Sequence, residues 1–316
     1  MSLENDPNLQ PILVTGAHRS GTTWVGKTLT ADPVRTYISE PLNINHPRGI
    51  FKAEVLHWYT YIHSGNEEAY LEAFQDTLKF RYHHGLEIKH LSSIKDLLRL
   101  VRDTAVFSVS RALDRRPLLK DPFAVFSVPW FRKRLNAQVV IMVRHPLPFV
   151  SSLKRLGWTF DFRNLLSQPE LINKLPEDYQ QEMRAFNGHP EDVIGQGILL
   201  WKTIYSRVYE YQSQDSGIII LKHEDLSRNP MDGFACLFET LGLDFSPETK
   251  RYIQLTTRGS NPEELAKNNK HAVQLDSQAN LNNWKKRLTE KEIERIITSS
   301  EEEVRLFYRE DAWQTW

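Results

Sequence analysis

The chain has 316 residues, and its 40 lysines and arginines balance its 40 aspartates and glutamates. A neutral chain gives no support for non-specific nucleic-acid binding, which needs clustered positive charge. The longest aliphatic runs, VVIMV and IIIL, are too short to span a bilayer, and the polar N-terminus has no signal-like apolar segment. We therefore expect a cytoplasmic protein with no membrane span and no nucleic-acid partner.

The first predicted elements are a buried strand at residues 12–15, a glycine-bounded loop and a helix at 23–30. The loop, GAHRSGTT at residues 16–23, differs from a nucleotide-binding phosphate loop because no lysine follows its second glycine. The glycines let backbone N–H groups turn inward, and the helix N-terminus adds positive potential. Arg19 adds a guanidinium, and two threonines add hydroxyls. The pattern predicts an anion site, with a simple glycine turn as the alternative.

Further strands are predicted from short apolar runs at residues 35–39, 117–120, 138–143 and 217–222. Helical patterns lie between them, and Thr289 with Glu292 has capping-box spacing at the start of a C-terminal helix. This alternation predicts an α/β, P-loop-like three-layer fold, with a central parallel sheet of about five strands flanked by helices. We expect one domain over residues 1–316. Insertions around 42–115 and 155–197 should shape a substrate site at the mouth of the sheet, where ligands bind in such folds.

A second motif, VRHPLPFVSS, follows the strand at 138–143. Arg144 lies at the carboxyl end of this strand, and Ser152 lies about two turns into the next predicted helix. A cation and a hydroxyl so placed can converge on one phosphate. The alternative is that Arg144 pairs with a carboxylate.

Other conspicuous residues are interpreted as structural. Cys236 lies in an apolar helical pattern, GFACLFETL, and is expected to be buried as a small hydrophobic residue. The aromatic run of Trp58, Tyr59 and Tyr61 is interpreted as core packing rather than an acceptor platform. Since no Cys/His cluster has the spacing of metal ligands, we expect no metal site.

Together, strand–RSGTTW–helix and VRHP…VSS resemble the sulfotransferases that use 3′-phosphoadenosine 5′-phosphosulfate (PAPS). In that family the first loop holds the 5′-phosphosulfate, and the arginine and serine of the second motif hold the 3′-phosphate. The resemblance implies PAPS as the donor and 3′-phosphoadenosine 5′-phosphate (PAP) as the product. It implies that the donor is bound by Arg19, Ser20, Gly21, Thr22, Thr23, Trp24, Arg144 and Ser152.

Two later segments, LKHEDLSRNP at 221–230 and LNNWKKRLTEKEI at 281–293, are also similar to this family. His223 stands where the family often has a tyrosine, which leaves its contact with the adenine open. The loop around residues 258–277 often closes over the nucleotide in the family. Its basic candidates are Arg258, Lys267 and Lys270.

Sulfonyl transfer needs a base for the acceptor's proton and positive groups around the transferring oxygens. Cytosolic members of the family often place a histidine after the lysine that ends a middle strand, but here Lys120 is followed by Asp121. Glu40, in SEPL, ends the strand after the loop helix and resembles a glutamate of the tyrosylprotein and carbohydrate sulfotransferases. The resemblance implies Glu40 as general base, with Lys120 and Arg19 as electrostatic stabilisers.

Each role has an alternative. Glu40 can instead accept backbone hydrogen bonds at its strand end, Lys120 can be a structural ion-pair partner of Glu40 or Asp121, and Asp121 is interpreted as a turn or cap residue. The predicted function is sulfonyl transfer to a hydroxyl acceptor, with Glu40-Pro41 favouring a carbohydrate or glycoconjugate. The other functions considered are a non-catalytic PAP- or PAPS-binding protein on the same fold and a P-loop kinase, against which the missing lysine counts.

Overall fold

A parallel sheet forms the centre of the computed structural model, which describes residues 10–186, 189, 191–264 and 273–309. The sheet has five strands in the order β2-β3-β1-β4-β5, and all neighbouring strands are parallel. The strands are β1 (Ile12–Gly16), β2 (Arg35–Ser39), β3 (Arg116–Lys120), β4 (Gln138–Val143) and β5 (Ile219–Lys222). These are the five predicted strands, and the predicted α/β fold is confirmed.

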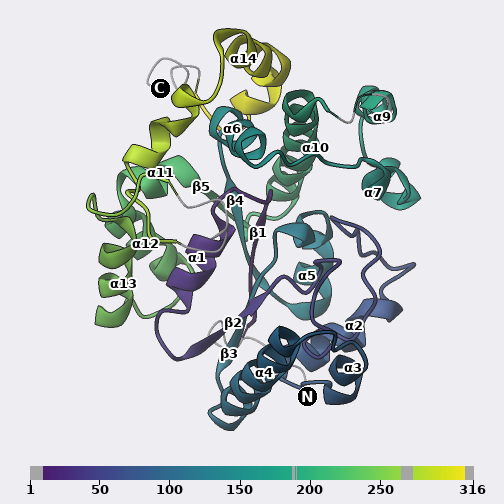
Figure 1. The fold of residues 1–316 in the computed structure, drawn as a ribbon, viewed down its shortest axis with the longest axis vertical. Helices are drawn as coiled ribbons and strands as arrows, with labels where there is room; N and C mark the ends of the chain where they lie inside the picture. Colours follow the sequence, from purple (N-terminus) through teal and green to yellow (C-terminus); the bar gives the residue numbers. More distant parts are fainter. Residues whose placement is uncertain (1–9, 187–188, 190, 265–272, 310–316) are drawn as a thin grey trace.

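Helices cover both faces of the sheet, because both faces are apolar. Alternate residues of a strand point to opposite faces. Ile12 and Val14 of β1 belong to one buried apolar cluster, and Leu13 belongs to the other. The first cluster lies under α1 (Thr22–Leu29), α11 (His223–Arg228), α12 (Pro230–Thr240) and α13 (Pro247–Thr257). The second lies under the 3₁₀ helix η1 (Pro122–Ser127), α5 (Val128–Leu135), α6 (Pro146–Leu156) and α10 (Val193–Gln214). Figure 1 shows the two helical layers on either side of the sheet.

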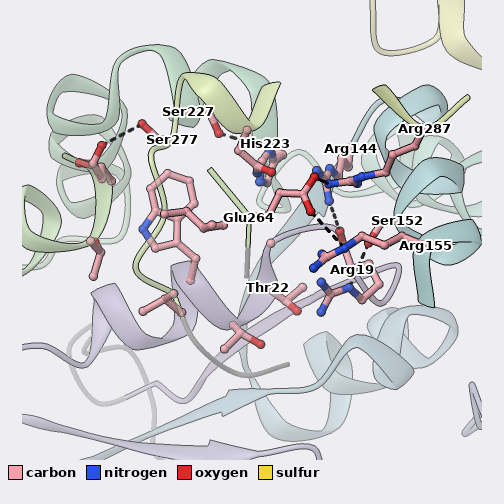
Figure 2. Close-up of a pocket in the computed structure, with 18 residues that line it drawn as sticks. Arg19, Thr22, Arg144, Ser152, Arg155, His223, Ser227, Glu264, Ser277 and Arg287 are labelled. Carbon is pink, nitrogen blue, oxygen red and sulfur yellow. Dashed lines mark hydrogen bonds and ion pairs between the residues drawn. The ribbon is translucent and has the colours of Figure 1, made fainter. Parts of the chain in front are cut away.

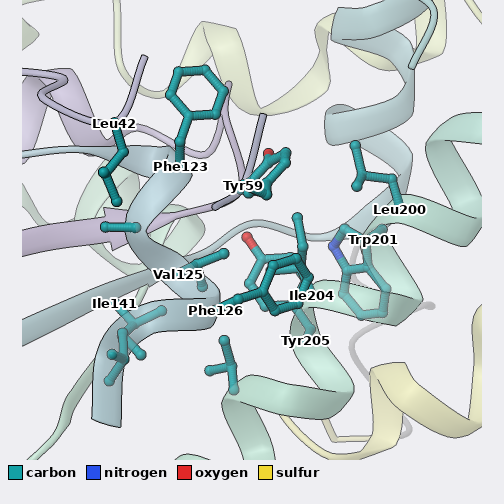
Figure 3. Packing of buried hydrophobic residues seen from close by; sticks show 14 of the residues in the cluster. Leu42, Tyr59, Phe123, Val125, Phe126, Ile141, Leu200, Trp201, Ile204 and Tyr205 are labelled. Carbon is teal, nitrogen blue, oxygen red and sulfur yellow. The ribbon is translucent and has the colours of Figure 1, made fainter. Parts of the chain in front are cut away.

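The second cluster contains the largest buried aromatic side chains (Figure 3). Tyr59 is fully buried there beside Phe123 and Phe126 of η1, with ring centroids 5.3 and 5.8 Å away. Trp58 and Tyr61 are partly buried and pack against the same cluster. The aromatic run therefore contributes to the core, as predicted.

The two predicted insertions fold into helices of different lengths and contact each other. The first carries α2 (Glu68–Leu78), α3 (His84–Lys89) and α4 (Ile94–Ala112), and the second carries α7 (Arg163–Leu166), α8 (Pro169–Ile172) and α9 (Glu177–Ala185). The backbone N–H of Trp58 donates to Asn164 Oδ1 at 2.9 Å, and that of Tyr61 donates to Gln168 Oε1 at 2.7 Å. These side chains therefore join the insertions at the same edge of the molecule.

The C-terminal segment returns to the helices of the second layer. A 3₁₀ helix, η3 (Ala279–Lys286), leads into α14 (Glu290–Arg305), which packs on α6 and α10. The predicted capping box is confirmed, because the N–H of Glu292 donates to Thr289 Oγ1 and the N–H of Thr289 donates to Glu292 Oε2. Within the described ranges, no helix combines the length and apolarity that crossing a membrane would require.

The prediction for Cys236 is wrong, because this cysteine is exposed. Phe234, Leu237 and Phe238 form the buried face of α12. Residues of a helix are offset by about 100° each, so the position between Phe234 and Leu237 can face the solvent even in an apolar run. The apolar composition of the segment did not reveal which side of the helix Cys236 would occupy.

Candidate active site

The loop between β1 and α1 has a backbone suited to surround an anion. Gly16 has φ 136° and Gly21 has φ 101°, values that favour glycine. A Cβ on Gly16 would lie 2.4 Å from the backbone oxygen of Met142, so glycine also permits close approach to β4. Arg19 has a positive φ of 67°. The turn brings the N-terminus of α1 to the carboxyl end of the sheet, where its N–H groups can meet a ligand.

Most of the predicted loop residues line one pocket, which is shown in Figure 2. They are Arg19, Gly21, Thr22, Thr23 and Trp24. Ser20 points into the protein instead, where its hydroxyl donates to the backbone oxygen of Ala17 at 2.6 Å. The Ser20 side chain therefore stabilises the loop from within.

Arg144 and Ser152 line the same pocket, so the structure brings the two sequence motifs together. Arg144 Nη1 donates to the backbone oxygen of Arg19 at 2.8 Å, and Arg19 Nε donates to Ser152 Oγ at 3.2 Å. These bonds connect residues from the loop, the end of β4 and α6. Burial lowers the pKa of Arg144 to about 10, with Glu224 opposing the shift and Arg19 adding to it. At this pKa, Arg144 is a cation at neutral pH.

The Nε atom of Arg144 is a hydrogen-bond donor that the described residues do not satisfy. This nitrogen is buried, and no side chain or backbone group in the described ranges accepts a hydrogen bond from it. Buried polar groups of native proteins almost always have a partner, which can be a ligand. The Arg144 side chain therefore fits an anionic ligand in this pocket.

Three charged residues of the pocket were not predicted. Arg155, on α6, lies 3.3 Å from Glu264 through Nε and Oε2, and Arg287 forms an ion pair with the other oxygen of Glu264. Figure 2 shows these side chains close to Arg144 and Arg19. Arg155 had a usable signal, since it lies three residues after Ser152 on the same predicted helix. Glu264 and Arg287 lie in the segments 258–277 and 281–293, which resemble the family, but nothing in those segments singled out these two residues.

The pocket also has lining residues that carry little charge. Trp24, His223, Ser227, Val273 and Leu275 are among its lining residues. A Cβ on Gly21 would lie 2.7 Å from His223 Cδ2, so the second loop glycine allows the loop to pack against this ring. Burial, and then Arg144, lower the pKa of His223 well below its usual value. His223 is therefore a neutral ring beside the loop.

The predicted nucleotide-closing loop contributes to the pocket through Glu264, Val273, Leu275 and Ser277. Of the three basic candidates, Arg258 is exposed and lies 3.4 Å from Asn261. Lys267 and Lys270 lie outside the described residues. The described part of this loop therefore presents an acidic residue and small or apolar side chains to the pocket.

Glu40 and Lys120 form an ion pair at the ends of β2 and β3. The Lys120 side chain is 0% exposed and that of Glu40 is 18% exposed. Asn43 Nδ2 donates to Glu40 Oε2 at 2.7 Å. Burial disfavours the charged form of Lys120, but Tyr37 and Glu40 outweigh this effect and raise its pKa. The structure therefore contains the ion pair that was the structural alternative for Lys120, and Lys120 is protonated at neutral pH.

Asp121 is a helix cap, as interpreted from the sequence. It is buried, and its Oδ1 accepts from the N–H of Phe123 at 2.9 Å at the start of η1. Its Oδ2 accepts from the N–H of Leu42, which fixes the turn after Glu40 against the end of β3. Burial raises the pKa of Asp121 to about 7.

His18 is a loop residue that the charges of both Arg19 and Glu40 affect, and no sequence pattern singled it out. Its Nδ1 is 2.6 Å from the hydroxyl of Tyr59, and its ring lies within about 6 Å of Phe149 and Trp158. Burial, and then Arg19, lower the pKa of His18 to about 4, against an opposing effect of Glu40. A neutral histidine therefore connects the loop to the buried Tyr59.

The fold and this pocket define an α/β enzyme with an anion-binding loop at the carboxyl end of a parallel sheet. The family model described as "Sulfotransferase family" matches residues 11–247. The chain belongs to the sulfotransferase family, and the predicted class of enzyme, a PAPS-dependent sulfotransferase, is confirmed. No curated protein sequence matches the chain.

Several solved structures are similar to the chain. Sulfotransferase STF9 from Mycobacterium avium is 17% identical with a TM-score of 0.47, and the match covers 96% of this chain and 78% of that one. The sulfotransferase domain of the Synechococcus PCC 7002 olefin synthase is 15% identical with a TM-score of 0.45, over 94% and 97% of the two chains. Mouse SULT7A1, solved with PAP, is 13% identical with a TM-score of 0.44, over 97% and 86%. The family assignment rests on the family model.

Proposed function

We propose that the enzyme transfers a sulfonyl group from PAPS to a hydroxyl of a carbohydrate or glycoconjugate, with Glu40 as general base. The observation that supports this most is the hydrogen-bonded link from Arg144 through Arg19 to Ser152. This link brings the two sequence motifs, which both have groups suited to bind phosphate, into one pocket. PAPS requires such an arrangement because its ribose has a phosphate at the 3′ position and a phosphosulfate at the 5′ position.

The donor-site residues have complementary tasks in this proposal. The loop N–H groups and the hydroxyls of Thr22 and Thr23 would hold the 5′-phosphosulfate, and Arg144 with Ser152 would hold the 3′-phosphate. The buried Nε of Arg144, which lacks an acceptor among the described residues, supports the fit. Trp24 and His223, which also line the pocket, would flank the adenine of the donor.

Glu40 and Lys120 would act on the acceptor side. Glu40 would take the proton of the acceptor hydroxyl while the new O–S bond forms and the bond from sulfur to the phosphate oxygen breaks. Lys120 and Arg19 would place positive charge near the sulfonyl oxygens and the leaving phosphate. The support is that Glu40 and Lys120 lie at adjacent strand ends, at the same carboxyl edge of the sheet as the loop. In the described structure Lys120 pairs with Glu40, so the acceptor would have to share or replace this contact.

The acceptor class is inferred from fewer features. Glu40-Pro41 resembles the carbohydrate enzymes, and the two insertions lie beside each other in the fold. We include 42–115 and 155–197 in a single domain of 1–316 and assign acceptor selection to them. The non-catalytic alternative keeps the arginine pocket but gives the Glu40–Lys120 pair a purely structural role.

Ligand-induced thermal stabilisation tests the donor assignment. The melting temperature would be measured with PAP, adenosine 5′-phosphate and ATP at equal concentrations. PAP should stabilise most, because it alone can fill both phosphate sites. Stabilisation by ATP that equals or exceeds that by PAP would refute the donor assignment and would favour the alternative of a P-loop kinase.

A further inference from the structure

The pocket contains two arginines in addition to Arg19 and Arg144, which the two sequence motifs supply. Arg19, Arg144, Arg155 and Arg287 all line it. Burial lowers the pKa of Arg19, and the charges of Arg155 and Arg287 lower it further. The neighbouring guanidinium groups therefore disfavour the charge of Arg19, and an anion between them would offset this effect.

Glu264 supplies an anion to two of these guanidinium groups. One carboxylate oxygen pairs with Arg155 at 3.3 Å, and the other pairs with Arg287. Burial would raise the pKa of Glu264, but the hydrogen bond and charge of Arg287 and the charge of Arg155 outweigh it and lower the pKa. A carboxylate between two guanidinium groups makes the contacts that a phosphate would make there.

The two arginines have supports other than Glu264. Arg155 belongs to α6, and Arg287 Nη1 lies 3.5 Å from Ser151 Oγ on the same helix. Lys154 Nζ donates to the backbone oxygen of Arg287 at 2.9 Å and also pairs with Glu292 at 2.7 Å. These contacts hold the backbone of Arg287 to α6 and α14 whether or not its guanidinium pairs with Glu264.

We propose that Arg155 and Arg287 bind the 3′-phosphate of the donor together with Arg144 and Ser152, and that Glu264 is an internal anion that competes with this phosphate. The inference rests on the proposed donor. Donor binding must then break the ion pairs of Glu264, so this residue lowers the affinity for the donor.

The test is calorimetric titration of PAP and adenosine 5′-phosphate into the full chain and into Glu264→Gln. The amide removes the competing charge at nearly constant volume, so PAP should bind about fivefold more tightly, the equivalent of one partly exposed ion pair. The affinity for adenosine 5′-phosphate, which lacks the 3′-phosphate, should change little. Arg155→Gln and Arg287→Gln should each weaken PAP binding at least about tenfold while changing adenosine 5′-phosphate binding less.

Glu263→Gln is the matched control. Glu263 precedes Glu264 and pairs with exposed Lys286 at 2.7 Å, so this change should leave both affinities at their wild-type values. If Glu264 instead holds the arginines in place, Glu264→Gln will weaken PAP binding, and the inference is overturned. It is also overturned if Glu264→Gln behaves like the control. Wild-type protein that does not bind PAP would overturn the proposed donor itself, whereas PAP binding without the Glu264 effect would overturn only this inference.

Discussion

Replacing Glu40 with glutamine should show how much the Glu40–Lys120 ion pair, at the ends of β2 and β3, contributes to the free energy of unfolding. The substitution removes the negative charge from a partner of Lys120, whose side chain is 0% exposed. Two unit charges about 4 Å apart at an effective dielectric constant of about 20 interact by about 4 kcal/mol. The Glu40 side chain is 18% exposed, and the glutamine oxygen can still accept a hydrogen bond, so part of this energy is retained.

We therefore expect Glu40→Gln to lower the free energy of unfolding by about 3 kcal/mol, since a buried charge left without its partner is strongly destabilising. Urea denaturation at pH 7 measures this change. Lys120→Met and the double variant complete a double-mutant cycle, in which the coupling between the two sites should be at least about 2 kcal/mol. A loss below about 1 kcal/mol for Glu40→Gln, or additive effects in the cycle, would refute the assignment of a strong buried pair.

Three further outcomes are expected. Arg144→Ala should weaken PAP binding about a hundredfold by calorimetry, because it removes a charge-assisted phosphate contact; unchanged affinity would remove Arg144 from the donor site. Burial lowers the pKa of His145 to about 3, so its stabilising contribution is present above about pH 6.5 and is lost as the pH falls toward the folded-state value. His145→Asn should therefore lose about 2 kcal/mol less stability than wild type between pH 7 and pH 5 in urea denaturation, and an equal loss would contradict the reasoning. Gly16→Ala should destabilise by at least about 2 kcal/mol and abolish PAP binding, because its Cβ would lie 2.4 Å from a backbone oxygen. Gly85→Ala, where a Cβ has open space on α3, is the control and should leave PAP binding unchanged without destabilising the protein.

The strands of this fold could be predicted because each is a short apolar run. Val139, Val140, Ile141 and Met142 of β4 are all fully buried, and residues from both faces of this strand enter a core cluster. A strand buried on both faces has a continuous apolar sequence, which is visible without a structure. The glycine-bounded loop was visible for a similar reason, because its backbone requires glycine at defined positions.

The rest of the site depends on contacts between distant segments. Arg287 contacts Ser151 of α6, which is 136 residues away in the sequence. Its segment, 281–293, resembles the family, but no pattern within the segment selects this residue. Ser20 was assigned to the donor from the motif alone, although its hydroxyl bonds to the backbone of its own loop. Composition and motif spacing predicted which segments form the site, but the direction of each side chain follows from tertiary packing.

Transfer of labelled sulfonyl groups from PAPS to a panel of carbohydrate hydroxyls, by wild type and Glu40→Gln, tests the central claim most directly. The proposal predicts that wild type labels an acceptor and that Glu40→Gln, with PAP affinity within about threefold of wild type, loses at least about a hundredfold in rate. The measurement would be made below the melting temperature of the variant, so that its lower stability does not affect the rate. Transfer by Glu40→Gln at a near wild-type rate would contradict the role of Glu40 as general base.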